Sequence, residues 1–485
     1  MAKAASLVCL VLAAAGLGTR AWGLSAAAGK IDITPSADER RGVYLAGFGA
    51  KGRRPSGIHD PLYAHLLVLQ DGPRVVALAS LDLLGLYRND VEDLRRLSGF
   101  NGPDHHLFVA ATHDHSGPDT LGFWGPWPGA SGVNKRWQRR TKDRVAAALR
   151  DLDAHLREVR LNGWHGRLDP QGLCRDGRDP VIIDPDLAAL EFSDRNGRSV
   201  ATIVNWSCHA EALGRDNLLI TADFPGFLCG KVERERGGTC LFFNGAIGGL
   251  LTPERAPGQD GFAEASRIGT AVADAALRGL AGASLRQEHP ALDFHSRLVP
   301  VPIENSRYLL ALPALTFGHR LFDSAGRPLP GWQAYWLALR HALGMLRPEA
   351  RPWIETEVSV LDVGPARLLG IPGEAFPELL IGGYDGRYRY GHPLVRPENA
   401  DPPDLAAAPR PPYLKDFIRR PLPMVVGLAN DEIGYLVPKY DFKIRDNRLM
   451  LPRLPGDHYE ETNSIGPAAT GLIVHAAEGL LGDHP

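Results

Sequence analysis

The sequence predicts an α/β fold, a large single domain with mixed β-sheets and flanking helices. Apolar β-like runs alternate with turn signals, and helical patterns separate several of them. The chain has 485 residues and is 44% hydrophobic, which allows one large domain with a substantial core. Its net charge is -2 and it has no long basic run, so nucleic acid is not an expected partner.

The expected elements follow one another along nearly the whole chain. Strands are expected at 30–34, 64–69, 75–81, 107–112, 187–192, 199–206, 239–243, 298–303 and 355–363. Helices are expected at about 135–156, 261–280 and 332–346. The Pro-rich segment 396–423 is interpreted as a surface excursion and not as a linker between domains.

The first residues have the features of an export signal. Lys3 supplies positive charge, residues 4–18 form a short apolar core, and small residues follow from Gly23 onward. The apolar run is too short to span a bilayer. We therefore expect a cleaved signal peptide at 1–28, cut between Gly23 and Gly29, and a secreted or periplasmic domain over 29–485.

Four cysteines remain beyond this leader: Cys174, Cys208, Cys229 and Cys240. Their even number permits disulfides in an exported protein, and none has the Cys-x-x-Cys spacing of a zinc or redox motif. Cys208 precedes His209, and neighbouring residues on a strand point to opposite faces. We expect Cys208 to be a buried small hydrophobe, and the pairing of the cysteines stays open.

The most informative stretch is Val-Ala-Ala-Thr-His-Asp-His-Ser-Gly-Pro at 109–118. His113 and His115 stand two residues apart at the end of an apolar run, so on a strand they would share one face. The Ser-Gly-Pro that follows predicts a turn. Two imidazoles at a strand end are suited to a metal site or to catalysis, although two partly exposed loop histidines would give the same pattern.

Other polar residues follow apolar runs in the same way. His209, Asp223, Glu374 and Tyr435 each lie at or near a turn after β-like sequence, which places them along one rim of a sheet. Each has a structural explanation when taken alone. Glu374, for example, could belong to the N-cap region of a helix starting near residue 376.

Taken together, these segments resemble the neutral/alkaline (non-lysosomal) ceramidase family, in its N-terminal catalytic domain. The resemblance rests on Gly-Ile-His-Asp-Pro-Leu-Tyr-Ala at 57–64, Leu-Val-Leu at 67–69, Ser-Leu-Asp at 80–82, Thr-His-Asp-His-Ser-Gly-Pro at 112–118, Ala-Asp-Phe-Pro-Gly at 222–226, Pro-Gly-Glu at 372–374, Gly-Tyr at 434–435 and Tyr-Glu at 459–460. The blocks occur in family order over nearly the whole mature chain. The set is specific, although no single block is.

In that family, two histidines, a glutamate and a tyrosine hold a zinc ion. The resemblance therefore implies Zn²⁺ as cofactor, held by His113, His209, Glu374 and Tyr435. It also implies catalytic roles for His115, as proton donor or oxyanion stabiliser, and for Arg175, as a substrate contact with Arg178 as the alternative. Such a site suits an amide, which is a poor electrophile with a poor leaving group.

The loop after the strand at 239–243 departs from the family. Ceramidases have Gly-Asp-Val-Ser-Pro-Asn there, and this chain has Gly-Ala-Ile-Gly-Gly-Leu-Leu-Thr-Pro at 245–253. Ala246 and Gly248 replace the aspartate and the serine, and Thr252 is expected to be structural. Attack by zinc-activated water is then the mechanism that remains.

Two further departures concern Asp114 and the chain length. Asp114 stands where the family usually has threonine, and we expect it to be solvated or structural, with a role in orienting another side chain as the alternative. The chain ends soon after Tyr459. We therefore expect no C-terminal β-sandwich domain of the kind that ceramidases carry.

The sequence thus predicts a secreted zinc-dependent hydrolase of an amide bond, acting on N-acylsphingosine or a related N-acyl substrate. A hydrolase of another amide or ester, and a catalytically inactive ligand-binding homologue, are the alternatives. The expected partners are a small-molecule or lipid amide substrate and, peripherally, a membrane; the oligomeric state is not predicted. A metal-free serine hydrolase is disfavoured because Gly-x-Ser-x-Gly is absent.

Overall fold

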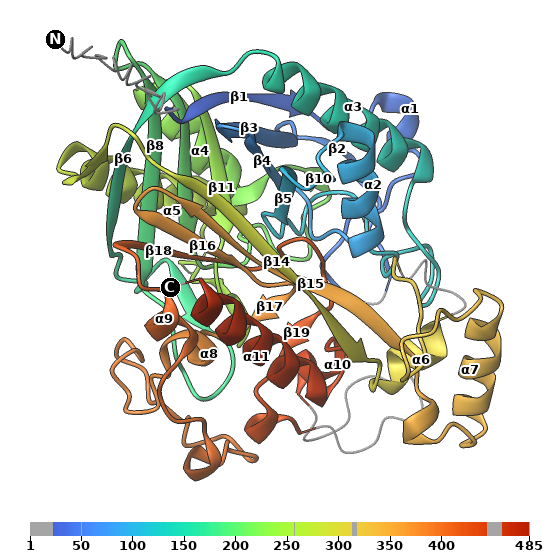
Figure 1. The fold of residues 1–485 in the computed structure, drawn as a ribbon. Coiled ribbons are helices and arrows are strands. Elements are labelled where there is room, and N and C mark those ends of the chain that lie inside the picture. The colour runs from blue at the N-terminus through green and yellow to red at the C-terminus, as the bar shows by residue number, and fades with distance from the viewer. Residues whose placement is uncertain (1–22, 50, 257, 313–317, 444–457, 485) are drawn as a thin grey trace, which may run out of the picture.

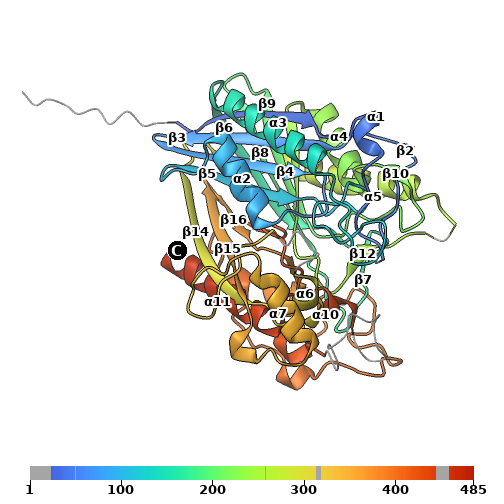
Figure 2. The ribbon, with the colours of Figure 1, turned by 90° about the vertical axis from the view of Figure 1, so that its right-hand side faces the viewer.

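Two β-sheets pack against each other between layers of helices in the computed structural model, which describes all residues except 1–22, 50, 257, 313–317, 444–457 and 485 (Figure 1, Figure 2). The larger sheet has nine strands in the order β11-β9-β8-β6-β1-β3-β4-β5, with β13 also paired to β6. The smaller sheet has four strands in the order β14-β15-β16-β18. Three short pairs, β10-β2, β12-β7 and β17-β19, lie outside them.

The strands of the larger sheet are β1 (Ser25–Asp32), β3 (Tyr63–Asp71), β4 (Arg74–Leu81), β5 (His105–Ala111), β6 (Arg157–Arg167), β8 (Asp186–Asp194), β9 (Ser199–Trp206), β11 (Thr239–Asn244) and β13 (Leu285–Gln287). The smaller sheet contains β14 (Leu292–Pro302), β15 (Trp353–Val363), β16 (Ala366–Gly370) and β18 (Leu422–Val426). The short strands are β2 (Gly57–Ile58), β7 (Cys174–Asp176), β10 (Leu219–Ile220), β12 (Leu251–Pro253), β17 (Glu374–Ala375) and β19 (Tyr435–Leu436).

The α-helices are α1 (Ala37–Arg40), α2 (Arg88–Ser98), α3 (Lys135–Asp153), α4 (Asp223–Arg236), α5 (Gly261–Ala281), α6 (Ser306–Ala311), α7 (Gln333–Ala342), α8 (Pro377–Ile381), α9 (Leu414–Phe417), α10 (Tyr459–Thr462) and α11 (Pro467–Asp483). Three 3₁₀ turns are η1 (Pro348–Ala350), η2 (Leu405–Ala407) and η3 (Lys439–Asp441). None of the helices in the described part of the chain has both the length and the apolar composition needed to cross a bilayer.

The central strands are apolar on both faces because both faces are covered. In β3, Leu66 and Val68 pack with Trp137 of α3, and Leu67 and Leu69 pack toward the second sheet. This alternation explains why these strands appear in the sequence as continuous apolar runs. Helices α4 and α5 cover β8, β9 and β11 in the same way.

The larger sheet curls, so that strands far apart in its order come near one another. The Ser80 hydroxyl of β4 donates to the Phe242 carbonyl of β11. The Asn244 side chain at the end of β11 donates to the Thr112 carbonyl just after β5. The ends of β5, β9 and β11 are thereby brought together.

The α/β fold class with mixed sheets and flanking helices is confirmed, but several boundaries differ from those predicted. β1 covers Ser25–Asp32 and not 30–34, and α3 ends at Asp153 because β6 starts at Arg157. The sequence pattern missed β6, α2, α4 and α11. β1 also begins inside the range 1–28 expected to be the leader, with Leu24 already buried.

All four cysteines in the described residues are buried and free. Cys208 packs among Val204, Trp206 and Phe242. The expectation that it is a buried small hydrophobe is confirmed.

Candidate metal centre

Four strand ends deliver the predicted ligands to one place. His113 follows β5, His209 follows β9, Glu374 follows β16, and Tyr435 comes after β18. Glu374 and Tyr435 are directly paired in the short parallel ladder of β17 with β19. All four side chains are buried.

His113 lies in the turn after β5 and not on the strand. Its φ of 65° is in the left-handed region, which is rare for a residue with a side chain and is concentrated at functional sites. Its Nδ1 is 2.8 Å from the Leu84 carbonyl. Because a carbonyl only accepts, Nδ1 carries the proton, and the unprotonated Nε2 lies 3.6 Å from Glu374 Oε2.

His209 is held in the same manner on the other side of the site. Its Nδ1 donates to the Leu251 carbonyl at 2.7 Å, and its Nε2 lies 3.0 Å from Glu374 Oε2. The Tyr435 hydroxyl is 3.3 Å from the same Nε2. The Nε2 atoms of both histidines thus converge with a carboxylate and a phenol.

His115 stands beside this group. Its ring centroid is 4.9 Å from that of His113 and 5.6 Å from that of His209. The three histidines can present nitrogen atoms within 4.8 Å of one another, so a set of three imidazoles overlaps the predicted set. The position of Glu374 favours the predicted set. Its Oε2 lies 3.6 Å from Nε2 of His113 and 3.0 Å from Nε2 of His209, the two histidines predicted to be ligands.

The electrostatics of the group keep His113 and His115 neutral. Burial lowers the pKa of His113 to about 4. Burial, with the neighbouring imidazoles, also holds the pKa of His115 well below its usual value. For His209, burial acts in the same direction, but the hydrogen bond and charge of Glu374 outweigh it and raise the pKa. Neutral imidazole is the form that binds metals.

A second buried carboxyl, Glu432, stands near Glu374. Burial and the charge of Glu374 raise its pKa well above the usual value, so it is held protonated beside the ionised Glu374. Its Oε1 accepts the Gly434 amide hydrogen at 2.8 Å. No local sequence pattern marks Glu432 as part of the site.

The two arginines considered for substrate contact have different surroundings. Arg178 is buried and bonded to the carboxylates of Asp441, Glu460 and Glu461, which engages its guanidinium in the fold. Arg175 is exposed on β7, opposite Thr252 of β12. This leaves Arg175 as the candidate, and its role stays a prediction.

Asn244 is a residue that sequence reasoning missed as part of the site. Its amide donates to the carbonyls of Thr112 and Cys208, at 3.1 and 2.7 Å, and its Oδ1 accepts the Cys208 amide hydrogen at 3.0 Å. One buried side chain therefore fixes the residues preceding His113 and His209. The only sequence signal is a polar residue that ends an apolar strand before a Gly-rich loop.

Glu211 was also missed. Its Oε2 lies 3.3 Å from His115 Nδ1, and its Oε1 accepts the Thr252 hydroxyl at 2.6 Å. The contact with His115 is within ion-pair distance, although neither ring nitrogen of His115 has an aligned hydrogen-bond partner among the described residues. Thr252 is thus structural, as expected, because it holds this carboxylate.

Asp114 and Gly248, two positions at which the sequence departs from the ceramidase pattern, are both buried. Asp114 is fully buried, so it is not solvated; its Oδ1 accepts the Ser116 amide hydrogen at 2.8 Å, which is a structural role in the turn. Gly248 is closed in: a Cβ there would lie 2.3 Å from the Phe376 ring and 2.8 Å from the Ala375 backbone. The loop has no room for a serine in its present conformation.

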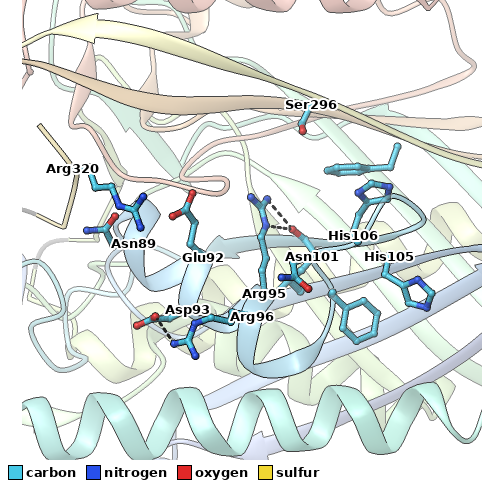
Figure 3. Close-up of a pocket in the computed structure, with 14 residues that line it drawn as sticks. Asn89, Glu92, Asp93, Arg95, Arg96, Asn101, His105, His106, Ser296 and Arg320 are labelled. Carbon is cyan, nitrogen blue, oxygen red and sulfur yellow. Dashed lines mark hydrogen bonds and ion pairs between the residues drawn. The ribbon is translucent and has the colours of Figure 1, made fainter. Parts of the chain in front are cut away.

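A cavity of about 700 Å³ lies elsewhere, between α2, the start of β5 and β14 (Figure 3). Its lining groups are partly engaged with one another, as Arg96 is with Asp93. It adjoins His105 and His106 at the start of β5, whereas His113 follows its end, about 20 Å away along the strand. It contributes no residue to the metal centre.

The chain is similar to known proteins in part of its sequence and in its fold. No family model matches the chain. Neutral ceramidase from Pseudomonas aeruginosa is 26% identical over 267 residues, which cover 50% of this chain and 39% of that protein. The matched part is thus less than half of the relative's length.

Two solved structures share the fold over 96% of this chain. The crystal structure of neutral ceramidase from P. aeruginosa has a TM-score of 0.64 with 18% identity and 75% coverage of that chain. A ceramidase complexed with C2 has a TM-score of 0.62 with 17% identity and 76% coverage. The chain is therefore a distant relative of the neutral ceramidases and has their fold.

Proposed function

We propose that the protein is a zinc-dependent hydrolase that cleaves the amide bond of an N-acyl lipid such as an N-acylsphingosine, with water as the nucleophile. The observation that carries this proposal is the convergence of His113, His209, Glu374 and Tyr435 at one buried point. The sequence similarity to a neutral ceramidase supports the choice of reaction.

The donor set fits a metal ion. His209 Nε2 and Glu374 Oε2 face each other at 3.0 Å, and the hydrogen bond and charge of Glu374 raise the pKa of His209, so in metal-free protein a proton lies between these two atoms. Metal binding would displace that proton, because neutral imidazole and carboxylate are both metal ligands. Two imidazoles and a carboxylate are ligands that zinc would accept with a position left for water or substrate, and the phenol of Tyr435 would be an additional ligand.

Zinc bound there would supply Lewis acidity and lower the pKa of water toward about 7. The chain's own residues supply the rest. The carbonyls of Leu84 and Leu251 fix the ligand histidines in one tautomer. His115, next to the ligands and facing Glu211, is positioned to accept a proton from the attacking water and pass it to the leaving amine, or to donate a hydrogen bond to the oxyanion.

The nucleophile follows from the loop after β11. Gly248 stands where the ceramidases have serine, and the space for a side chain is occupied by Phe376 and Ala375. We therefore assign the attack to water, activated in the site, and not to a protein hydroxyl.

The test combines metal analysis with hydrolysis of N-acylsphingosines of several acyl lengths by purified protein. We expect about one zinc per chain and fatty acid release, and both should be lost in His113→Ala and Glu374→Ala. The matched controls are His106→Ala and Glu378→Ala, which change the same residue types outside the ligand set. Full metal and activity in either ligand variant would show that the site is assigned wrongly.

A ligand-binding homologue without turnover is the second candidate, favoured by the closed position at Gly248. The same experiment separates it from the enzyme. Zinc content with no hydrolysis across panels of lipid amides, short amides and esters would support binding alone. Hydrolysis confined to short amides or esters would retain the metal site but change the substrate class.

We also propose that residues 1–28 contain an export leader. β1 starts at Ser25 and Leu24 is buried, so a cut at or just after Gly23 would leave the strand whole. N-terminal sequencing of protein recovered from the periplasm or medium tests this. A mature protein beginning beyond residue 28 would have lost half of β1.

A further inference from the structure

Helix α7 exposes a large apolar face. The solvent-exposed fractions are 61% for Trp332, 64% for Tyr335, 58% for Trp336, 48% for Leu339 and 63% for Leu343. These positions follow the 3.6-residue period, so they form one stripe, which we call the α7 outer face. Met345, just beyond the helix, is 60% exposed and extends the stripe.

The opposite side of the same helix already has a structural role. Ala334, Leu337 and Ala338 are buried, and Ala334 and Leu337 pack in the core with Leu309 of α6. A helix that is apolar on both sides is normally buried on both. The fold uses only the inner side, so holding the helix in place does not explain the outer face.

The surroundings of the α7 outer face are basic. Between residues 318 and 351 the sequence has five arginines and two acidic residues, whereas the whole chain has a net charge of -2. Arg340 and Arg347, at the end of α7 and just after it, are exposed. Aromatic and aliphatic side chains bordered by arginines are typical of helices that lie at the surface of an anionic bilayer.

The α6–α7 unit is attached close to the metal centre. The Tyr308 hydroxyl of α6 donates to the Asn463 carbonyl at 3.2 Å, and the same carbonyl accepts the backbone amide hydrogen of the predicted ligand Tyr435 at 3.2 Å. In Figure 1, α6 and α7 stand out from the body of the molecule at lower right. The α6–α7 unit is therefore joined through Asn463 to the backbone of a residue of the predicted metal centre.

We propose that the α7 outer face docks on an anionic lipid bilayer and brings the metal centre to lipid amides held there. This inference deepens the proposed function and rests on it for the substrate class. A bilayer is favoured over a protein occupant because the face combines Trp, Tyr and Leu with exposed arginines. Docking itself requires no turnover.

The test is flotation of the full chain with phosphatidylcholine vesicles that contain or lack phosphatidylglycerol. We expect binding that is stronger with phosphatidylglycerol and weakened by salt. Leu339→Ser/Leu343→Ser should weaken binding on the order of tenfold or more, and Arg340→Glu/Arg347→Glu should remove the preference for phosphatidylglycerol. The matched control is Leu218→Ser/Leu472→Ser, which changes exposed leucines elsewhere (42% and 37% exposed).

Three results would overturn the proposal. They are wild-type protein that does not float with either vesicle, leucine variants that float as well as the control, and an outer face that is covered in solution by a second copy of the chain. The last is detected as a dimer by light scattering that Leu339→Ser/Leu343→Ser converts to monomer. Circular dichroism of each variant checks that α7 still folds.

Hydrolysis separates this proposal from the proposed function. A short-chain, water-soluble N-acyl amide should be cleaved equally by wild type and by the leucine variant, while a vesicle-embedded amide should be cleaved more slowly by the variant. Vesicle binding without any hydrolysis would keep the docking face and reject the amidase. If both substrates are hydrolysed and the variants hydrolyse them as fast as wild type, the amidase is kept and the docking face is rejected.

Discussion

The ligand cluster and the loop after β11 lie side by side, yet they differ in what they retain. The cluster keeps all four predicted ligands, with Nδ1 of His113 and of His209 tied to backbone carbonyls. The neighbouring loop has Gly248 where the ceramidase pattern has serine, and Phe376 and Ala375 fill the space that a side chain would need there. The predicted metal ligands and the place of a nucleophilic side chain are thus separate parts of this fold, and only the predicted ligands converge at the strand ends.

If Asn244 holds the backbone next to His113 and His209 in place, Asn244→Ala should lower the unfolding free energy more than the other variants below. It would leave the Thr112 carbonyl and both backbone groups of Cys208 unpaired in a buried setting, costing about 4 kcal/mol of unfolding free energy. Urea denaturation and zinc content both measure the loss. Asn162→Ala, which removes one hydrogen bond to Leu280, is the control, and equal effects of the two would contradict a special role for Asn244.

The unfolding free energy of the metal-free protein should depend on pH, because His113 is buried. Burial lowers the pKa of His113 in the folded protein to about 4 from its ordinary value of 6.5, so below pH 6.5 the unfolded chain binds more protons. Its contribution to stability is therefore complete above pH 6.5 and lost as the pH falls toward 4, by about 3 kcal/mol. Denaturation of wild type and His113→Gln across this range should show a steeper pH slope for wild type; parallel slopes would contradict the burial argument.

The closed loop predicts that a serine at position 248 would not fit without a change in the fold. In Gly248→Ser the new side chain would meet Phe376 and the Ala375 backbone, and overpacking of this kind costs about 2 kcal/mol. We expect a lower melting temperature and no gain in hydrolysis. Gly102→Ser, at an open position, should be neutral, and a Gly248→Ser enzyme with raised kcat would break the comparison.

The smallest expected effect concerns His115. Glu211→Gln keeps the shape of the side chain but removes the charge that faces His115 Nδ1, so kcat should fall about tenfold, or 1.4 kcal/mol, with zinc content unchanged. Glu254→Gln, on an exposed carboxylate bonded to the Gly172 amide, is the control. A variant that instead loses zinc would show that Glu211 supports the ligands and not His115.

Sequence patterns predicted the fold class and the approximate position of most central strands. Strands β3, β4 and β5 are buried on both faces, so their sequences are continuous apolar runs that are easy to recognise. They also located His113 and His115, since a pair of histidines before Ser-Gly-Pro is a local signal. Physical reasoning placed them on a strand, however, while His113 occupies a left-handed turn. The turn is imposed by contacts with Leu84 and Asn244, which are distant in sequence.

Asn244 and Glu211 could not be recognised from sequence for the same reason. Their partners lie on segments that meet only when the large sheet curls and the second sheet packs against it. The helix α4 was missed because its pattern of apolar residues is weak and its first residue, Asp223, has a positive φ. The predicted ligand roles of Glu374 and Tyr435 came from family resemblance, and the structure adds the ladder that pairs them.

The residue that ties the two histidine segments together is followed by glycine, in the dipeptide Asn244-Gly245. Asparagine is among the heat-labile residues, and ring closure onto the next amide nitrogen is easiest when that next residue lacks a side chain. In the folded chain the Gly245 amide is bonded to the Trp206 carbonyl and the side-chain amide is fully committed, which restrains this ageing reaction. Once unfolding releases both, conversion to aspartate would put a carboxylate against two carbonyls, and heat inactivation would then become permanent.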